Sequence, residues 1–312
     1  MTSHALNPLR GIMLKVLSVV VFVMMQTCIK AAGPDIPAGQ ITFYRSAFAL
    51  VPIMAYLACR RELLAAFYTK SPIGHLKRGT LGILAMIFGF YGLVHLPMPD
   101  AIAIGYSMPL IAVVFAALIL KETVRLYRWS AVGVGMIGVV IISWPKLTLF
   151  NSAGAGSEQA LGAAAVLVAA VMGGFAMIQV RQLVRTEKTA TIVLYFSITA
   201  AVFSILSLPF GWVPLSGFER MCLIASGFFG GLGQILLTES YRQADVSTVA
   251  PFEYTSIILG IGIAYALFGD VPTISTLIGT AITVSAGIFI IYREHQLGLE
   301  RKAARKASTP NG

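Results

Sequence analysis

The stretch GIMLKVLSVVVFVMMQTCIKAA, residues 11–32, decides the fold, because it is almost wholly apolar and carries only two charged residues, Lys15 and Lys30. About 20 such residues let an α-helix cross a hydrocarbon core about 30 Å thick. Basic residues before an apolar run also resemble a secretory signal peptide. This run is too long for one, Lys30 lies beside the would-be cleavage site, and more hydrophobic sequence follows directly. We therefore predict a retained first transmembrane helix.

Nine further apolar runs follow, each long enough for one helical crossing. They cover residues 39–59, 79–96, 101–120, 127–144, 161–180, 189–210, 221–240, 248–268 and 274–291. Only 12% of the residues are charged and 57% are hydrophobic, about half the charged fraction of a soluble domain. The runs lack the period-two alternation of a transmembrane β-barrel. The prediction is an all-α integral membrane protein with ten transmembrane helices.

The net charge of +10 does not indicate a nucleic-acid partner, because the basic residues stand in short segments between the apolar runs. With the N-terminus inside, 18 of the 23 Lys and Arg residues fall on the cytoplasmic side and three on the outer side. This asymmetry is typical of inner-membrane proteins. We predict a bacterial inner-membrane protein whose two termini are both cytoplasmic.

The ten predicted helices divide into two halves of five. The longest polar stretch, residues 145–160, separates them and has the composition of a flexible linker. We predict one five-helix repeat in residues 1–150 and a second in residues 151–312, which ends in a basic cytoplasmic tail. An odd number of crossings per half makes the repeats inverted. At a shift of 148 residues Tyr106 aligns with Tyr254, and at 151 Tyr44 aligns with Tyr195. Inverted repeats place a substrate site between the halves and permit alternating access.

Several short motifs occur along the chain: FYRS at 43–46, LPMPDA at 96–101, YSMPL at 106–110, LKE at 120–122, APFEYT at 250–255 and FGDVP at 268–272. These motifs resemble those of the EamA-type branch of the drug/metabolite transporter superfamily. The family usually has Glu where this chain has Asp270. The resemblance covers about residues 10–293 and implies a secondary, non-ATP transporter of a small metabolite. Residues 9–30 with Phe43, Tyr44 and Arg45 look closest to proteobacterial members tied to riboflavin uptake. Riboflavin uptake is therefore the implied function, with export of amino acids or related metabolites as the alternative.

Two ionisable residues lie well inside predicted helices, where a charge costs about 2.5 to 3.5 kcal/mol on insertion scales. At 1.5 Å per residue, Arg45 lies about 10 Å from the outer face and Glu253 about 10 Å from the inner face. On this estimate both border one central cavity and contact substrate or a coupling proton. The alternative is a structural pair, or snorkelling toward the interface.

Aromatic residues inside the spans are further candidates for substrate binding: Tyr44, Tyr91, Tyr106, Tyr195, Tyr254 and Phe252. Their rings would stack on a planar ligand and the hydroxyl groups would form hydrogen bonds, although helix packing explains some of them. Pro109 and Pro251 interrupt related helices of the two halves and point to the site. We predict that Arg45, Tyr106, Tyr195 and Glu253 converge between the second, fourth, seventh and ninth helices.

Motifs for other chemistry are missing from the sequence. It contains no G-x-x-x-x-G-K-[ST] phosphate loop, and its four histidines form no H-x-x-H or H-E-x-x-H motif. We expect no catalytic residue, metal or cofactor, and an integral-membrane enzyme is the less favoured alternative. The expected partners are a small-molecule substrate and membrane lipid, with the chain a monomer or a homodimer.

Charged residues near the predicted helix ends are expected to be structural. Lys30 would anchor the first helix beside Asp35, and Glu122 and Asp270 would cap neighbouring helix termini. The basic tail after Arg293 would touch anionic lipid head groups. We expect its final residues to be disordered.

Overall fold

The computed structural model describes residues 8–121, 124–148, 155–184, 186–244 and 246–307. These residues contain no β-strand. Their helices are α1 (Pro8–Ala32), α2 (Ala38–Cys59), α3 (Leu63–Ala66), α4 (Pro72–His95), α5 (Met98–Gly105), α6 (Ser107–Ile119), α7 (Leu126–Leu147), α8 (Ala155–Leu183), α9 (Thr189–Ser204), η2 (Ile205–Phe210), α10 (Gly217–Gln243), α11 (Val246–Val249), η3 (Ala250–Tyr254), α12 (Thr255–Phe268) and α13 (Ile274–Ala307). Ten segments of the described chain are long and apolar enough to cross a membrane. The predicted all-α fold class is confirmed.

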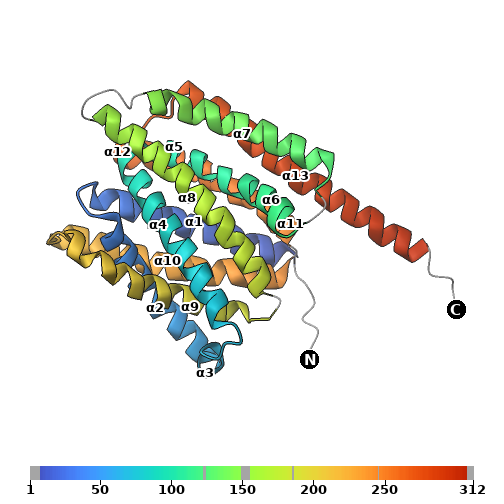
Figure 1. Cartoon of the computed structure of the whole chain (residues 1–312), viewed down its shortest axis with the longest axis horizontal. Coiled ribbons are helices and arrows are strands. Elements are labelled where there is room, and N and C mark those ends of the chain that lie inside the picture. Colours follow the sequence, from blue (N-terminus) through green and yellow to red (C-terminus); the bar gives the residue numbers. More distant parts are fainter. Residues whose placement is uncertain (1–7, 122–123, 149–154, 185, 245, 308–312) are drawn as a thin grey trace.

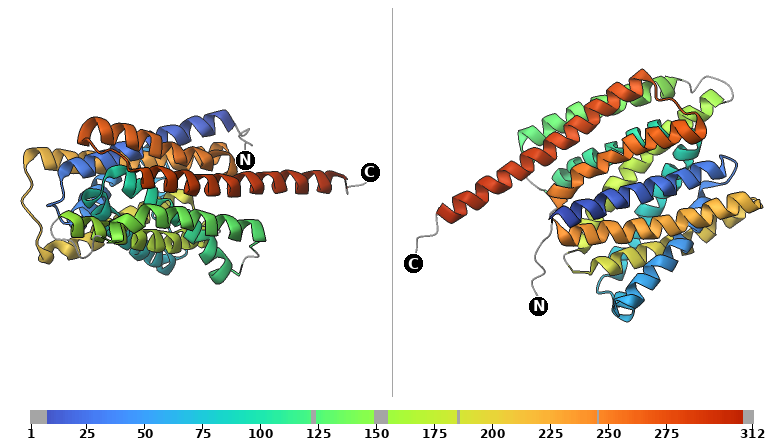
Figure 2. Two further views of the ribbon diagram at one scale, coloured as in Figure 1. Left: turned by 90° about the horizontal axis from the view of Figure 1, so that it is seen from above. Right: turned by 180° about the vertical axis from the view of Figure 1, so that it is seen from behind.

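The spanning segments lie side by side in one bundle (Figure 1). Because successive spans reverse direction, α1 begins and α13 ends at the same end of the bundle (Figures 1 and 2). We call this the proximal end, which also holds the end of α2 and the start of α4. The opposite, distal end holds the end of α1 and the start of α2. The 34-residue α13 projects past its neighbours at the proximal end (Figure 1).

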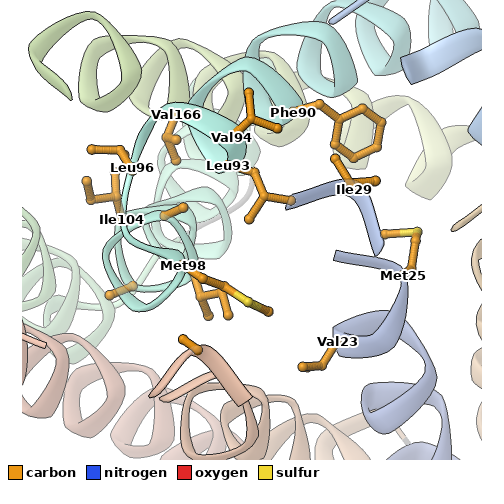
Figure 3. Packing of buried hydrophobic residues seen from close by; sticks show 14 of the residues in the cluster. Val23, Met25, Ile29, Phe90, Leu93, Val94, Leu96, Met98, Ile104 and Val166 are labelled. Atoms are coloured by element: carbon orange, nitrogen blue, oxygen red, sulfur yellow. The ribbon is translucent and has the colours of Figure 1, made fainter. Parts of the chain in front are cut away.

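The most extensive helix–helix contacts join helices that end before residue 148 to helices that begin at residue 155 or later. α1 packs along α10, α4 along α8, and α7 along α13. The largest buried cluster gathers side chains of α1, α4, α5 and α8, including Ile29, Phe90, Met98 and Val166 (Figure 3). Large apolar side chains elsewhere point outward, among them Leu206, Phe210, Ile258 and Tyr265. Helices that are apolar on every face fit a lipid surround.

α7 and α13 approach each other through glycine. A Cβ atom built on Gly138 would lie 2.6 Å from the Gly279 carbonyl oxygen, and one built on Gly279 would lie 2.5 Å from the Gly138 carbonyl oxygen. Thr283 Oγ1 donates to the Gly135 carbonyl at 3.2 Å and to the Gly279 carbonyl at 2.9 Å. The two helices therefore meet backbone to backbone at these glycines, beside the Thr283 and Ile142 side chains.

Several boundaries differ from the sequence prediction. The third span begins at Pro72 and not at residue 79, because Pro fits the first turn of a helix, whereas hydropathy drops at the basic residues 77 and 78. α7 continues to Leu147 and α8 begins at Ala155, so the connection is shorter than residues 145–160. α13 stays helical to Ala307. The predicted cap at Glu122 and the final residues of the tail lie outside the described residues.

Candidate functional site

A buried ion pair joins the first helix to a turn late in the chain. Lys15 Nζ of α1 donates to Glu253 Oε2 of η3. The Lys15 side chain is 2% exposed, whereas that of Glu253 is 50% exposed. Lys15 lies seven residues into α1, about 10 Å along the helix axis, so the pair is well inside the span. A lysine at this depth needs a counter-charge, and Glu253 supplies it.

Two tyrosines meet beside this ion pair. The ring centres of Tyr106 and Tyr254 are 5.1 Å apart in an edge-to-face arrangement. The Tyr106 hydroxyl shares a hydrogen bond with Ser256 Oγ at 2.6 Å. A Cβ atom on Gly287 of α13 would overlap the Tyr254 hydroxyl, so this glycine makes room for the ring. Glu253, Tyr254 and Ser256 thus present polar groups from one turn toward Tyr106.

Both tyrosines lie where a spanning segment departs from regular α-helix. Pro109 has no N–H to donate to the Gly105 carbonyl, and α5 ends at Gly105, with Tyr106 between α5 and α6. Pro251 likewise cannot donate to the Ser247 carbonyl, and the chain there forms the 3-10 turn η3 between α11 and α12. The two interrupted segments pack on each other through α5 and α12. The interruptions place Tyr106, Glu253 and Tyr254 together.

Arg45 lies elsewhere in the bundle. It is 4% exposed. A Cβ atom built on Gly230 of α10 would lie 3.0 Å from the Nε atom of Arg45. Nε and Nη1 have no hydrogen-bond partner among the described residues. Met25 of α1 lies at the same position, ten residues after Lys15 and therefore about 15 Å along the helix. Arg45 does not join the Lys15–Glu253 pair.

The remaining predicted site residues are dispersed. The Tyr195 ring stacks on His75 at 4.6 Å and its hydroxyl donates to the Phe67 carbonyl at 2.9 Å, at the proximal end. Tyr91 stacks on His95 near the distal end. The predicted convergence is therefore only partial, because Tyr106 and Glu253 lie close together while Tyr195 and Arg45 lie apart.

Tyr44 and Phe252 are the last two predicted residues. Tyr44 packs between Phe43 and Phe48 on its own helix, with ring centres 5.7 and 5.9 Å away. Phe252 is half-buried in η3, and its carbonyl accepts a hydrogen bond from Thr255. Phe252 directly precedes Glu253 of the ion pair in the sequence, whereas Tyr44 belongs to an aromatic cluster on α2.

Ion pairs at the distal end tie several helices together. Asp270 Oδ2 accepts the N–H of Met98 at the start of α5 at 3.0 Å, as expected of a residue that caps a neighbouring helix. Lys30 Nζ lies 3.6 Å from the same carboxylate, so the predicted anchor of the first helix pairs with Asp270. Lys146 Nζ lies 3.1 Å from Asp100 Oδ2. Asp100 was missed by the sequence prediction, because it falls between the apolar runs 79–96 and 101–120, although it lies inside α5.

A cavity of 330 Å³ opens at the proximal end between α2, α9 and α10, lined among others by Ile53, Tyr56, Val193, Gln234 and Glu239. Tyr56 donates to Glu239, and Arg242 Nη1 donates to the same carboxylate at 2.9 Å. The cavity therefore has apolar walls with a paired carboxylate at its mouth.

Glu187 also lines this cavity and connects two loops, an arrangement that we call the Glu187 clamp. Its Oε1 accepts hydrogen bonds from Thr69 Oγ1 at 2.8 Å and from the N–H groups of Lys70 and Ser71 at 2.7 and 2.9 Å. Burial pushes the pKa of the Glu187 carboxyl upward, but these hydrogen bonds and nearby His75 outweigh it and hold the pKa below its ordinary value. The clamp therefore contains an ionised carboxylate near neutral pH.

Sequence reasoning missed two basic residues. Lys15 was seen inside a span without a role, because its partner is 238 residues away. Arg78 was placed in a cytoplasmic loop, but it lies inside α4 with its guanidinium carbon 4.1 Å from the centre of the Phe196 ring. Among the described residues, no three His, Cys, Asp or Glu side chains gather into a group that would hold a metal ion.

Known proteins resemble this chain over nearly its whole length. It is 30% identical over 286 residues to the pseudopaline exporter of Pseudomonas aeruginosa, covering 90% of this chain and 93% of the relative. It is 28% identical over 267 residues to the S-adenosylmethionine uptake transporter of Rickettsia felis, with 85% and 86% covered. It is also 28% identical over 271 residues to the riboflavin transporter of Rhizobium johnstonii, with 86% and 85% covered.

A solved crystal structure shares the fold, with a TM-score of 0.62 at 20% identity, covering 92% of this chain and 98% of that chain. The sequence profile of the EamA-like transporter family matches residues 9–144 and 160–293, which confirms the resemblance seen in the short motifs. The relatives are transporters and not enzymes, and the ten apolar spans are those of a multi-pass membrane protein. This chain belongs to the EamA-like transporter family and is a membrane transporter of a small molecule.

Proposed function

We propose that this chain is a secondary transporter that works by alternating access, with Glu253 as the group that the solute or a coupling proton contacts. The Lys15–Glu253 pair carries the proposal. Half of the Glu253 side chain is exposed, although Lys15 is almost fully buried. A carboxylate at this depth is too costly to face lipid, so its exposed half belongs to a water-accessible space. A solute ammonium group or a proton entering there competes with Lys15 for the carboxylate.

The two interrupted segments support a moving contact between residues 1–150 and residues 151–312. Tyr106 comes from the first half and Tyr254 from the second, and their rings touch. The ion pair between Lys30 and Asp270 also joins the halves, at the distal end. We propose that these contacts separate and re-form as the halves rock, with the distal end closed and the proximal cavity open in the present conformation.

We further propose that the proximal end faces the cytoplasm of a bacterial cell. Arg78 lies inside α4, and under this orientation 17 of the 23 Lys and Arg residues lie on the cytoplasmic side and three on the outer side. Retention of Lys and Arg in cytoplasmic segments is the general rule for inner-membrane proteins.

Two solute classes follow from the geometry. The first is an amino-acid derivative with an ammonium group, because Glu253 offers a carboxylate that is only half covered. The S-adenosylmethionine uptake transporter is a relative with such a solute. The second is riboflavin, whose planar ring would stack against the Tyr106–Tyr254 pair. A riboflavin transporter is a relative at equal identity.

Flux measurements in proteoliposomes test these proposals. Radiolabelled S-adenosylmethionine and riboflavin are supplied separately, and saturable uptake of one identifies the class. Glu253→Gln should lower that uptake at least about tenfold, the equivalent of 1.4 kcal/mol. Asp35→Asn, in the exposed connection between α1 and α2, should retain it. Wild-type flux in Glu253→Gln would remove this residue from the mechanism, and conversion of solute without net flux would favour an enzyme.

A further inference from the structure

Two arginines on packed, neighbouring helices point into the bundle. Arg45 of α2 is 4% exposed and packs at Gly230 of α10. The Arg78 side chain runs along α4, so that its Nη1 lies where a Cβ on Gly82 would be, over the ring of Phe196. α2 packs against α4, so the two guanidinium groups come from adjoining helices. The bundle therefore holds two like charges on adjoining helices.

Neither arginine has a counter-charge within the described part of the chain. The Nε and Nη1 atoms of both are buried there without a hydrogen-bond partner. The carboxylates at other levels of the bundle already have partners: Glu253 has Lys15, Asp100 has Lys146, Asp270 has Lys30 and Glu239 has Arg242. Arginine stays protonated in proteins, so the pair cannot lose its charge. An anion placed between the two side chains would supply the missing acceptors.

The helices that line the proximal cavity continue toward this pair. Residues three or four apart share one face of a helix. Gln234 of the cavity wall lies one turn from Gly230 on α10, and Val193 lies one turn from Phe196 on α9. Ile53 follows Arg45 by two turns on α2. Each of three helices that line the cavity therefore continues to a residue at the arginine pair.

We propose that Arg45 and Arg78 bind a carboxylate group of the transported solute, in a site reached from the proximal cavity. This inference rests on the proposed function. The planar guanidinium group of arginine donates two parallel hydrogen bonds to the two oxygens of a carboxylate, which the ammonium group of a lysine does not. The site is distinct from the Lys15–Glu253 pair, which lies about 15 Å away along α1. Phe196 and Gly230 belong to the second half of the chain and both arginines to the first, so a bound carboxylate lies between the halves.

Thermal unfolding of the full chain in phosphatidylcholine nanodiscs tests the site, with sodium succinate compared to sodium chloride at equal ionic strength. Succinate should raise the unfolding midpoint of the wild type. Arg45→Met and Arg78→Met should abolish this shift, and in chloride their midpoints should not fall, because each removes an unpaired buried charge. A purely structural role for the arginines would instead lower the midpoint and leave the succinate shift unchanged.

A gentler variant covers the case in which the arginine variants do not fold. Gly82→Ala keeps both charges but places a Cβ in the space of Arg78 Nη1, and it should reduce the succinate shift. Gly89→Ala on the same helix is the matched control, because its Cβ would lie 3.7 Å from Ala169, an ordinary contact. It should retain the shift.

Three results would overturn the inference. The first is no succinate shift in the wild type, or an equal shift in every variant. The second is a shift with inorganic phosphate but not with succinate. The third is an arginine-dependent shift produced by phosphatidylglycerol in the nanodisc in place of succinate, which would make the anion a lipid head group. Flux without a succinate response would refute this site alone, whereas a succinate response without flux of any solute would refute the proposed function.

Discussion

Charged side chains inside the bundle differ in how completely they are neutralised, and this difference assigns their roles. Lys15 is 2% exposed and depends on Glu253, whereas Glu253 keeps half of its surface exposed. The buried partner of such a pair suffers most when the pair is broken, because it cannot regain water. Lys15 is therefore the structural member of the pair, and Glu253 is the member that can change partners.

This asymmetry predicts unequal effects of removing the two partners. Glu253→Ala leaves a buried ammonium group unpaired and should lower the free energy of unfolding by about 1–3 kcal/mol. Lys15→Met leaves a carboxylate that water can still reach, so its effect should be smaller. The double variant should be more stable than Glu253→Ala alone. Thermal unfolding in detergent gives all three values, and equal losses for the two single variants would contradict the asymmetry.

At the scale of elements, the interruptions of two spanning segments shape the site. α5 and α6 are separate helices because Pro109 leaves the Gly105 carbonyl without its helical partner. This places Tyr106 at a junction, where its hydroxyl reaches Ser256 of α12. The hydrogen bond that is missing at the Gly105 carbonyl weakens the helix there, and the segment can bend at this point.

Pro109→Ala should therefore join α5 and α6 and change stability and transport in opposite directions. Proline inside a helix costs about 3 kcal/mol, so the variant should unfold at a higher temperature, while solute flux should fall because Tyr106 turns away from α12. Pro72→Ala is the control, because Pro72 occupies the first turn of α4, where proline is tolerated. It should change neither quantity much. Unchanged flux in a stabilised Pro109→Ala would show that the interruption has no part in transport.

The Glu187 clamp makes the connection between the α3–α4 and α8–α9 loops dependent on pH. The pKa of Glu187 is lowered in the folded chain, so its contribution is complete above the ordinary Glu pKa of about 4.3 and is lost as the pH falls through the folded value. The wild type should unfold at a higher temperature than Glu187→Gln near neutral pH, and the difference should shrink below about pH 4.

Glu62→Gln is the control for the clamp, because Glu62 lines the same cavity but its carboxylate accepts no hydrogen bond from the described residues. Its difference from the wild type should not follow the same pH course. A Glu187→Gln midpoint that tracks the wild type at every pH would show that the clamp does not stabilise the fold.

At the scale of the whole molecule, the two ends of the bundle are built differently. The distal end is fastened by charged pairs, Lys30 with Asp270 and Lys146 with Asp100. The proximal end holds the cavity, with the Tyr56–Glu239 hydrogen bond at its mouth, and the Glu187 clamp. The end with the cavity is the one assigned to the cytoplasm in the proposed function.

Cysteine labelling should establish which end faces the cytoplasm. Cys59 is exposed at the proximal end, and in a Cys28→Ala, Cys222→Ala background it is the sole thiol. A membrane-impermeant maleimide should label it only after the cells are permeabilised. Asp35→Cys with Cys59→Ala places the thiol in the distal connection and should be labelled in intact cells. The reverse pattern would place the proximal end outside.

The fold was largely predictable, because each spanning segment corresponds to a long apolar run in the sequence. The direction of each side chain was not predictable, because helices that are apolar on every face give no signal of which face turns inward. Tyr195 lies in α9, but it points to His75 and Phe67, away from Tyr106.

Pairings across long sequence separations were equally hidden. Lys15 and Glu253 carry no local signal for each other. The predicted third span excluded Arg78, because hydropathy falls at the basic residues 77 and 78. The helix itself begins six residues before Arg78, at Pro72. The long, flexible arginine stem lets such a charge reach inward from near a helix end.

The glycine contact between α7 and α13 has a mechanical consequence. Gly138 and Gly279 place backbone against backbone, and Thr283 bonds to the Gly135 carbonyl across the seam. Sliding one helix along the other would push a carbonyl oxygen into the facing backbone and break that hydrogen bond. Rolling about the line of contact does neither. Because α7 belongs to residues 1–150 and α13 to residues 151–312, the proposed rocking of these two parts would turn about this seam, and the helices farthest from it would move the most.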